Sequence, residues 1–469
     1  MTFHRGAAVR WGACLMLVAA PAVSAQAPAP DSSAAARRAD LARFRTEVLE
    51  AEKAFTPEAR MAARDRLRRL EGAADTVSPV YLELELARIV ALVDNGHSMA
   101  FAAPRARRYN RIPLRLAPFG TDFYVLRGAS AHADLLGARL VAIDGRDLAD
   151  LRSLARSLAG GTDGWRDRTA AYFLESPQQL HALGVARAAD AATYRFVLTN
   201  GQTVERSIDA EPPVAGRNLL GGARVLYPGA GATGNDGWFT LLAAERAPWV
   251  LQEPGAFFRA RLAPEVDGMV VELRQTRDAP GLPIRRFLDS MTTEIRRHQP
   301  RHLVLDMRMN GGGDLNTARD FMRSLPGLVP GRIFVLTSPW TFSAAISSVG
   351  YLEQAAPDRV TIVGEMVGDR LEFWAEGPVV ILPNVGAEIL ISTERHDYRN
   401  GCRAYRDCHG SVVRHPISVP SLAPDIAAPW TIEAYRAGRD PAMEAVAAAT
   451  SPAPSPPLPA GSVPLRPPR

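Results

Sequence analysis

The chain has 469 residues, of which 47% are hydrophobic, and a formal net charge of +5. This length and composition predict two to four domains with well-filled apolar cores. The basic residues are arginines spread along the whole chain, with no block of like charge, so a nucleic-acid-binding surface is not indicated. Lysine occurs once, at Lys53.

The first 25 residues have the pattern of a secretory signal peptide. Arg5 and Arg10 form a basic region before a short apolar stretch, residues 11–23. This stretch is too short to cross a bilayer. Val23-Ser24-Ala25 fits a small-residue cleavage site. No later segment is long and apolar enough to span a membrane. We therefore expect a periplasmic or secreted bacterial protein.

Residues 26–104 are predicted to form a helical segment. Leu41, Phe44 and Val48 recur at helical spacing, and residues 80–92 carry a second helical pattern. We expect these helices to pack on the remainder of the protein and to deliver His97 at their end.

Residues 105–210 are predicted to form a separate β-rich domain. Alternating residues and turn signals predict strands at 114–116, 123–126, 136–145, 194–198 and 203–208, with a helix at 148–158. The stretch GARLVAIDGRDL, residues 137–148, resembles a PDZ domain. Such domains add an extended peptide to the edge of a sheet. A β-domain that only spaces the core is the alternative.

Residues 211–448 alternate between strand and helix patterns. Strands are predicted at 238–242, 269–273, 303–305, 333–336 and 360–363, and a hairpin at 379–392. Helices are predicted at 283–297, from 315 onward and from 343 to 354. Periodicity alone predicts an α/β fold with a parallel sheet. The Pro-rich tail, residues 449–469, is predicted to be disordered.

The stretch from 301 to 345 combines features that suit acyl transfer. One apolar run leads to Asn310-Gly311-Gly312-Gly313, and a second leads to Ser343 at the start of a helix. Bare amides at a glycine turn can hold an oxyanion, and a helix start carries partial positive charge. A plain loop and a helix-capping serine are the structural alternatives.

These pieces resemble the tail-specific, or C-terminal processing, serine peptidases, with the tricorn core and retinoid-binding-protein modules as relatives. The matching stretches are LVLDMRMNGGG at 303–313, TFSAA at 341–345, 362–365, 93–98, 423–426 and 438–441. The resemblance spans roughly residues 40 to 447. It implies a crotonase/ClpP-like α/β core of repeated β-β-α units, with the helical segment before it and the PDZ-like domain inserted.

The resemblance implies Ser343 as the nucleophile. It also implies that the backbone N–H groups of Gly312 and Ala344 bind the oxyanion. Asp306 and Arg308 are expected to brace the glycine turn.

The resemblance also bears on the general base. In the tail-specific branch the base is a lysine, but Arg370 stands at that position of the block GEMVGDR, residues 364–370. Arginine stays protonated and cannot act as a base. The tricorn-like branch uses a histidine from an upstream block, and His97 matches it. A histidine that only caps a helix end is the alternative for His97.

A third group should orient the histidine. The candidates are Asp94, Glu365, Glu394 and Asp397, and we retain Glu365 and Glu394 as the acids to test. The tricorn-like pattern has a glutamate shortly before the closing block, but residues 417–421 contain no acid.

Two cysteines remain after the signal peptide, Cys402 and Cys408. An even pair in an oxidising compartment predicts a disulfide. A metal site is the alternative because His396 and His409 flank the pair, but the spacing matches no zinc pattern. We therefore expect no metal and no cofactor.

Two functions follow as hypotheses. The first is an exported serine-type peptidase that cleaves extended or C-terminal segments of peptides or unfolded proteins through an acyl-enzyme. The second is a catalytically inactive family member that binds a peptide or a small apolar ligand in the same groove. Neither has a nucleic-acid partner, and the sequence does not indicate an oligomeric state.

Overall fold

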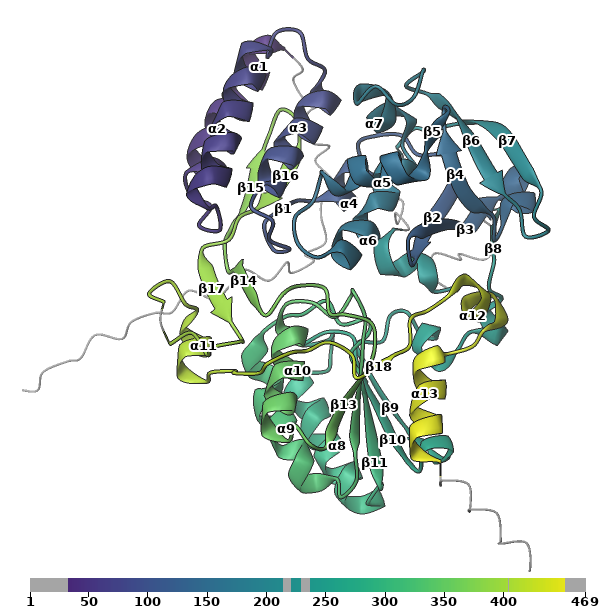
Figure 1. Cartoon of the computed structure of the whole chain (residues 1–469), viewed down its shortest axis with the longest axis vertical. Helices are drawn as coiled ribbons and strands as arrows, with labels where there is room; N and C mark the ends of the chain where they lie inside the picture. Colours follow the sequence, from purple (N-terminus) through teal and green to yellow (C-terminus); the bar gives the residue numbers. More distant parts are fainter. Residues whose placement is uncertain (1–32, 214–220, 229–236, 404, 452–469) are drawn as a thin grey trace, which may run out of the picture.

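The computed structural model of the protein describes residues 33–213, 221–228, 237–403 and 405–451. The expected signal peptide and most of the expected Pro-rich tail lie outside these residues. In Figure 1 the N-terminal helices and the β-rich segment form an upper part, and one large sheet with its helices forms a lower part. The two parts meet where the predicted site residues gather.

Three helices begin the described chain: α1 (Ala34–Arg43), which continues as a π-helix over Phe44–Leu49, α2 (Pro57–Gly72) and α3 (Pro79–Ala91). Each begins after a hydroxyl residue, Ser33, Thr56 or Ser78, whose side chain accepts a backbone N–H of the first turn. This N-cap bond satisfies a donor that the helix itself leaves without a partner. Helices therefore occupy the segment where the sequence predicts them.

The hairpin of β15 (Val379–Leu382) and β16 (Ala387–Leu390) packs against these helices. β1 (Met99–Ala100) pairs antiparallel with β16. Asp40 of α1 accepts hydrogen bonds from the backbone N–H groups of Asn384 and Val385, at 3.0 and 2.7 Å. The hairpin predicted at 379–392 therefore exists, but it joins the N-terminal helices instead of the lower sheet.

The β-rich segment forms a mostly antiparallel sheet with strand order β2-β3-β4-β6-β7. Its strands are β2 (Leu114–Phe119), β3 (Asp122–Ala129), β4 (Arg139–Ile143), β5 (Arg146–Asp147), β6 (Ala191–Val197) and β7 (Thr203–Asp209). Its helices are α4 (Ala102–Arg105), α5 (Leu148–Arg156), α6 (Asp163–Leu174) and α7 (Pro177–Ala182). The sequence did not predict α6 or α7.

One predicted strand has a different partner from the one expected. β8 (Trp238–Thr240) pairs with β3 of the upper sheet, so the stretch 238–242 does not enter the lower sheet. The upper part also shares a single apolar core. Leu82 of α3, Phe123 of β3 and Ile389 of β16 belong to the same buried cluster. The helices, the β-rich segment and the hairpin are therefore packed as one body.

The lower part is built on a six-stranded sheet with order β18-β13-β12-β11-β10-β9. The strands from β18 (Ile426–Ala427) to β10 are parallel, and β9 runs antiparallel to β10. The other bounds are β9 (Phe258–Ala263), β10 (Gly268–Leu273), β11 (His302–Asp306), β12 (Ile333–Thr337) and β13 (Val360–Gly364). The predicted mixed α/β fold with a parallel sheet is confirmed.

Single helices join the consecutive parallel strands: α8 (Ile284–His298), α9 (Leu315–Leu328) and α10 (Ala344–Ala355). They cover one face of the sheet, and α13 (Pro441–Thr450) covers the other (Figure 1). α13 extends two residues into the predicted tail. The central strands β10 to β13 are buried on both faces and are mostly apolar, whereas the edge strand β9 is partly exposed. The parallel strands β10, β11 and β12 are thus each followed by one helix, a β-α alternation where the family resemblance implied β-β-α units.

The last elements lie beside the boundary between the two parts. They are β14 (Glu372–Ala375), β17 (Glu394–Asp397), α11 (Gly410–Arg414) and α12 (Ile432–Ala437). β14 and β17 pair antiparallel. No helix of the described residues is long and apolar enough to cross a membrane.

Candidate active site

Ser343 occupies a sharp turn between a strand and a helix. β12 ends at Thr337, and α10 begins directly after Ser343. The backbone of Ser343 has φ 55° and ψ −128°, and its half-buried side chain makes no capping hydrogen bond. A positive φ is costly for a residue with a Cβ, and such strain persists where the surrounding structure enforces it. A serine on a strained turn between a strand and a helix is the backbone arrangement of a nucleophile elbow.

The glycine turn lies directly against Ser343. Gly312 has φ 99°, and a Cβ on it would lie 2.6 Å from the Cβ of Ser343, so only glycine fits there. The Gly312 N–H donates to Asn310 Oδ1 at 2.9 Å. The Ala344 N–H belongs to the first turn of α10 and has no hydrogen-bond partner among the described residues. Of the two predicted oxyanion donors, only Ala344 is therefore free.

Arg308 braces the glycine turn, as predicted. It makes paired hydrogen bonds to Asp306 at 3.0 and 2.6 Å, and to Asp440 at 2.7 and 2.9 Å. Both acids are held in bidentate contact, which fixes orientation as well as charge. Asp440 also accepts the Met443 N–H at the start of α13. This explains why the motifs at 303–313 and 438–441 occur together: they bind each other.

His97 lies in the loop between α3 and β1 and faces the lower part. It is buried, and its Nδ1 lies 3.0 Å from Oδ2 of the buried Asp369. Its Nε2 is also buried but has no hydrogen-bond partner among the residues that the structure describes. The imidazole is stacked between Phe342 at 4.2 Å and Phe373 at 4.7 Å. Because Phe342 directly precedes Ser343, this stacking places the imidazole next to the serine turn.

Two neighbours of His97 hold its loop. Asn95 donates to the backbone oxygen of Trp374 at 2.9 Å and accepts the Trp374 N–H at 3.0 Å, which pins the loop to β14. A Cβ on Gly96 would lie 2.7 Å from Asp369 Oδ2. The absence of a side chain at Gly96 therefore allows Asp369 to reach the imidazole.

Sequence reasoning missed Asp369. The two acids it retained lie elsewhere: Glu394 is 2.6 Å from His409 Nδ1, and Glu365 lines a pocket described below, where burial raises the pKa of its carboxyl. Asp397 accepts backbone N–H groups from its own turn. A signal was present, because Asp369 directly precedes the position where the tail-specific branch has its lysine.

The basic residues at the site are not placed to accept a proton. Arg370 donates to the backbone oxygen of Asp94 at 2.7 Å and to its carboxylate at 2.8 Å. Asp94 also pairs with Arg166. Lys53, the only lysine, is exposed next to the N-terminal helices. The serine–lysine arrangement of the tail-specific branch is therefore absent from this chain.

His97 is one member of a column of stacked rings, which we call the ring column. Its members, in order, are Trp165, Phe342, His97, Phe373, His396 and His409, with successive centroids 3.6, 4.2, 4.7, 4.8 and 5.2 Å apart. The planes of neighbouring rings lie within 22° of parallel. Stacking on both faces fixes the orientation of the His97 ring through packing, in addition to the bond to Asp369.

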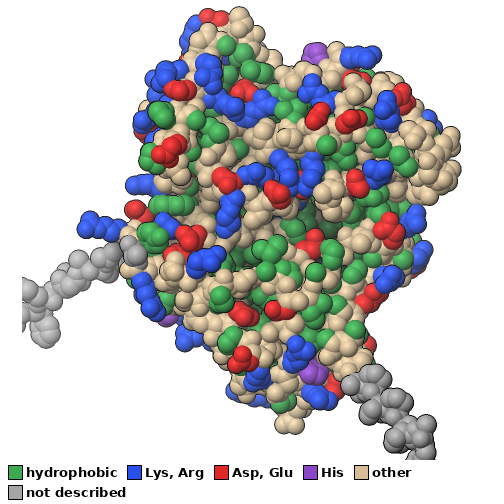
Figure 2. All heavy atoms as spheres, viewed as in Figure 1, with side chains coloured by type: hydrophobic (Ala, Val, Ile, Leu, Met, Phe, Trp, Pro, Cys, Tyr) green, Lys and Arg blue, Asp and Glu red, His purple; other side chains and the backbone are tan. Residues whose placement is uncertain are grey.

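A pocket of about 120 Å³ opens beside the site between the two parts. Figure 2 shows a hollow at this boundary, with basic side chains above it and hydrophobic ones below. The guanidinium of Arg168 lines the pocket, stacked on Trp165 at 3.0 Å and Trp340 at 4.3 Å. No carboxylate among the described residues pairs with Arg168, and burial lowers its pKa well below the ordinary value. The indole N–H of Trp430 in the same pocket also lacks a partner.

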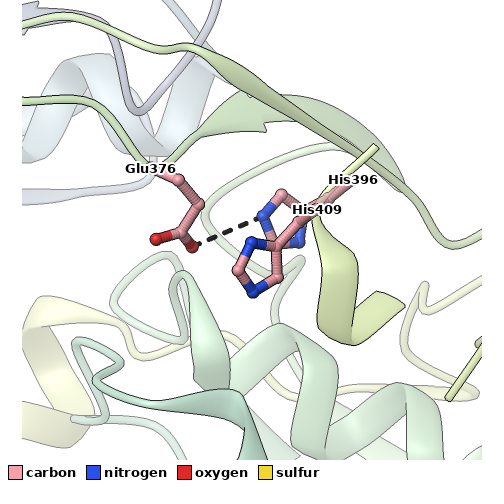
Figure 3. Close-up of side chains that lie close together, drawn as sticks. All are labelled: Glu376, His396 and His409. Atoms are coloured by element: carbon pink, nitrogen blue, oxygen red, sulfur yellow. Dashed lines mark ion pairs between the residues drawn. The ribbon is translucent and has the colours of Figure 1, made fainter. Parts of the chain in front are cut away.

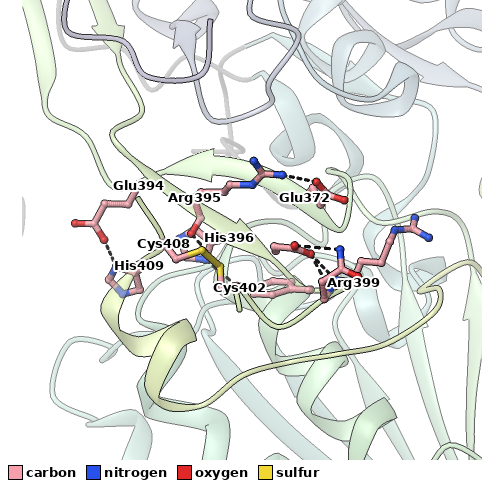
Figure 4. The surroundings of a disulfide bond; sticks show 11 residues. Glu372, Glu394, Arg395, His396, Arg399, Cys402, Cys408 and His409 are labelled. Carbon is pink, nitrogen blue, oxygen red and sulfur yellow. Dashed lines mark hydrogen bonds and ion pairs between the residues drawn. A yellow bond between two sulfur atoms is a disulfide. The ribbon is translucent and has the colours of Figure 1, made fainter. Parts of the chain in front are cut away.

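The predicted disulfide between Cys402 and Cys408 is confirmed (Figure 4). It closes a short loop between β17 and α11. His409 follows directly after Cys408, so the disulfide holds this histidine close to β17.

Comparison with known proteins gives a fold but no close relative. No family model and no curated protein sequence matches the chain. The structure of mature CPAF complexed with lactacystin has a TM-score of 0.53 at 15% identity, covering 89% of this chain and 98% of that one. A CPAF mutant gives 0.54 at 14%, covering 89% and 96%. The photosystem II C-terminal processing protease gives only 0.37 at 14%, covering 87% and 98%. The two CPAF comparisons show that the chain has the CPAF fold, in agreement with the predicted fold family.

Proposed function

We propose that this protein is an exported serine-type peptidase with Ser343 as nucleophile, His97 as general base and Asp369 as the acid that orients the histidine. The observation that carries the proposal is the buried His97–Asp369 pair, whose imidazole stacks on Phe342, the residue before the strained turn at Ser343. When Asp369 accepts a hydrogen bond from Nδ1–H, the lone pair of the imidazole is on Nε2, where it can take the proton of a serine hydroxyl.

The reaction then follows from the positions of these groups. Ser343 Oγ attacks the carbonyl carbon of a peptide bond while His97 Nε2 takes its proton. The Ala344 N–H donates to the oxyanion that forms. A second donor is available if Gly312 exchanges its bond to Asn310 for one to the oxyanion. His97 returns the proton to the leaving amine, and water hydrolyses the ester in a second round.

The side chains that line the pocket are suited to bind a substrate that carries a carboxylate. Arg168 offers a guanidinium without a counter-ion, and Trp430 offers an unpaired N–H, within a wall that also contains Phe119, Met309 and Trp340. A desolvated cation attracts an anion strongly, and the apolar wall suits a nearby hydrophobic side chain. We infer that the pocket binds a C-terminal or side-chain carboxylate of an extended peptide. Export agrees with the disulfide, which persists in oxidising compartments.

A second candidate function is peptide binding without catalysis. The Ser343 hydroxyl and His97 Nε2 are not within hydrogen-bond distance in this structure, and the Gly312 N–H is already bonded. Catalytic hydrogen bonds are often long before substrate binds, so this geometry is compatible with both functions.

Labelling with a fluorophosphonate probe separates the two. The probe reacts with a serine whose proton is taken by a base, so the peptidase should be labelled at Ser343. Ser343→Ala should abolish labelling, and Ser347→Ala, one turn along α10, should leave it unchanged. A folded wild-type protein that is never labelled at Ser343 would favour the binding function.

A further inference from the structure

Three potential metal ligands meet at the far end of the ring column. Glu376 follows β14, His396 lies in β17 and His409 precedes α11, as Figure 3 shows. One donor atom of each lies within 4.8 Å of the others. Glu376 Oε1 is 3.5 Å from His396 Nε2. Segments on both sides of the disulfide loop thus bring two imidazoles and a carboxylate to one point.

His396 is prepared to act as a ligand. It is only 2% exposed, and among the described residues its Nε2 has no polar neighbour in hydrogen-bonding geometry besides the carboxylate of Glu376 at 3.5 Å. Its Nδ1 lies 3.0 Å from the hydroxyl of Tyr398, which in turn lies 2.6 Å from Ser347 Oγ. In the tautomer whose Nδ1–H donates a hydrogen bond to Tyr398, Nε2 carries the lone pair and lies 3.5 Å from Glu376 Oε1. A metal-bound histidine typically has its other ring nitrogen held in this way.

Contacts with residues outside the cluster also fix the positions of His409 and Glu376. The His409 N–H donates to the backbone oxygen of Arg395 at 2.9 Å, and the preceding residue is the disulfide-bonded Cys408. Glu394 contacts His409 Nδ1 at 2.6 Å and so brings a second carboxylate to the edge of the cluster. The backbone oxygen of Glu376 accepts a hydrogen bond from Thr393. The three side chains are therefore positioned by contacts outside the cluster.

We propose that Glu376, His396 and His409 form a binding site for a divalent transition-metal ion, with Zn²⁺ as the best match. Two imidazoles and one carboxylate are a ligand set that Zn²⁺ accepts, whereas Mg²⁺ and Ca²⁺ prefer oxygen ligands. Zinc bonds of about 2.0–2.2 Å at tetrahedral angles place two ligand atoms about 3.3–3.5 Å apart. The Glu376–His396 separation already meets this spacing.

The third ligand must approach by roughly 1 to 1.5 Å to complete the site. His409 is able to make this movement because it is half-buried and lies at the start of a short helix. The fourth coordination position is then open to water. The sequence predicted no metal because the spacing of the cysteines matches no zinc pattern. In the proposed site the cysteines are not ligands, since they form a disulfide. The ligands are Glu376 and the two histidines near the disulfide.

Metal content of the purified, oxidised chain is the direct test, and it does not depend on peptidase activity. After dialysis against about 1 µM free Zn²⁺, the wild-type protein should retain one zinc per chain. Glu376→Gln and His409→Ala change side chains that are exposed or half-buried, and each should abolish stoichiometric retention. Glu394→Gln should weaken binding about 10- to 100-fold, as expected for a partner of a ligand. His415→Ala, in the same region but outside the cluster, should leave binding unchanged.

Two results would overturn the assignment. One is a folded wild-type protein that retains no zinc under these conditions. The other is retention that survives both Glu376→Gln and His409→Ala, because the ion would then be bound elsewhere on the chain.

Discussion

The sharpest test of the proposed catalytic group is Asp369→Asn. The substitution keeps the size of the side chain but replaces one oxygen by an NH₂ group. If this NH₂ faces His97, it donates to Nδ1 and moves the imidazole proton to Nε2, so that the base has no lone pair for Ser343. If the amide is turned the other way, its NH₂ meets the Arg370 N–H, which now donates to Asp369 Oδ1 at 2.9 Å. The first orientation keeps both hydrogen bonds but leaves His97 in the wrong tautomer, and the second loses the hydrogen bond from Arg370.

The expected decrease in kcat follows from the distance between His97 and Asp369. The imidazolium that forms during the reaction would lie 3.0 Å from the carboxylate. At an effective dielectric constant of ~20, their attraction amounts to about 5 kcal/mol. The charge-assisted hydrogen bond itself is worth about 1.5–3 kcal/mol and overlaps with this figure. We therefore expect a loss of about 4–5 kcal/mol, which corresponds to a 10³- to 10⁴-fold decrease in kcat.

The assay is kcat on an unfolded-protein substrate, together with the rate of fluorophosphonate labelling. Asp94→Asn is the matched control, because Asp94 lies in the same region and contacts Arg370, but does not contact His97. It should change kcat by less than about threefold, as is usual for an exposed ion pair. A thermal unfolding scan of each variant checks that the fold is retained. A folded Asp369→Asn protein with near wild-type kcat would refute the orienting role.

Three further predictions concern the catalytic pair, the pocket and the sheet. His97→Ala and Ser343→Ala should each lower kcat by several orders of magnitude, and the double variant little further, because the two groups act as a unit; additive losses measured in single-turnover assays would contradict the pairing. Arg168→Met keeps the apolar stem but removes the charge, so KM for a peptide with a free carboxylate should rise about 10- to 100-fold; an equal rise for the amidated peptide would exclude charge recognition. Burial and the nearby Asp425 raise the pKa of Glu353 from 4.5 to about 7, so the folded state binds this proton more tightly than the unfolded state does. The contribution of this proton to the free energy of unfolding is therefore lost as the pH rises through about 7. Because the carboxyl is only half-buried, Glu353→Gln should stabilise the protein by about 1 kcal/mol at pH 8 and by nothing at pH 4 in urea titrations; an equal gain at both pH values would show that charge is not the cause.

The sequence predicted the local parts of the site well. The turn at Ser343 and the glycine turn at Gly312 each depend on residues a few positions apart, and strand, turn and helix signals follow from such short-range patterns. The bracing role of Arg308 was also predicted correctly. These features depend on interactions between residues that are close together in the sequence.

The parts that the sequence did not predict depend on distant contacts. His97 and Asp369 are 272 residues apart, and no periodic pattern links them. The hairpin at 379–390 was recognised, but its packing against α1 depends on bonds to Asp40 that only the folded chain reveals. Helix α6 was missed because its buried residues, from Trp165 to Leu174, lie on several sides of the helix. A helix without a single apolar stripe has no helical periodicity to detect.

The ring column has a consequence for how the protein can be controlled. Its first three rings come alternately from the upper and the lower part: Trp165 from α6, Phe342 from the serine turn and His97 from the loop after α3. The separation between His97 and Ser343 is therefore set by how the two parts are docked, and by no single element. A shift of ~1 Å between reacting groups can reduce turnover about 100-fold. A ligand that moves the two parts apart or closer together would therefore change the rate of hydrolysis without contacting His97 or Ser343.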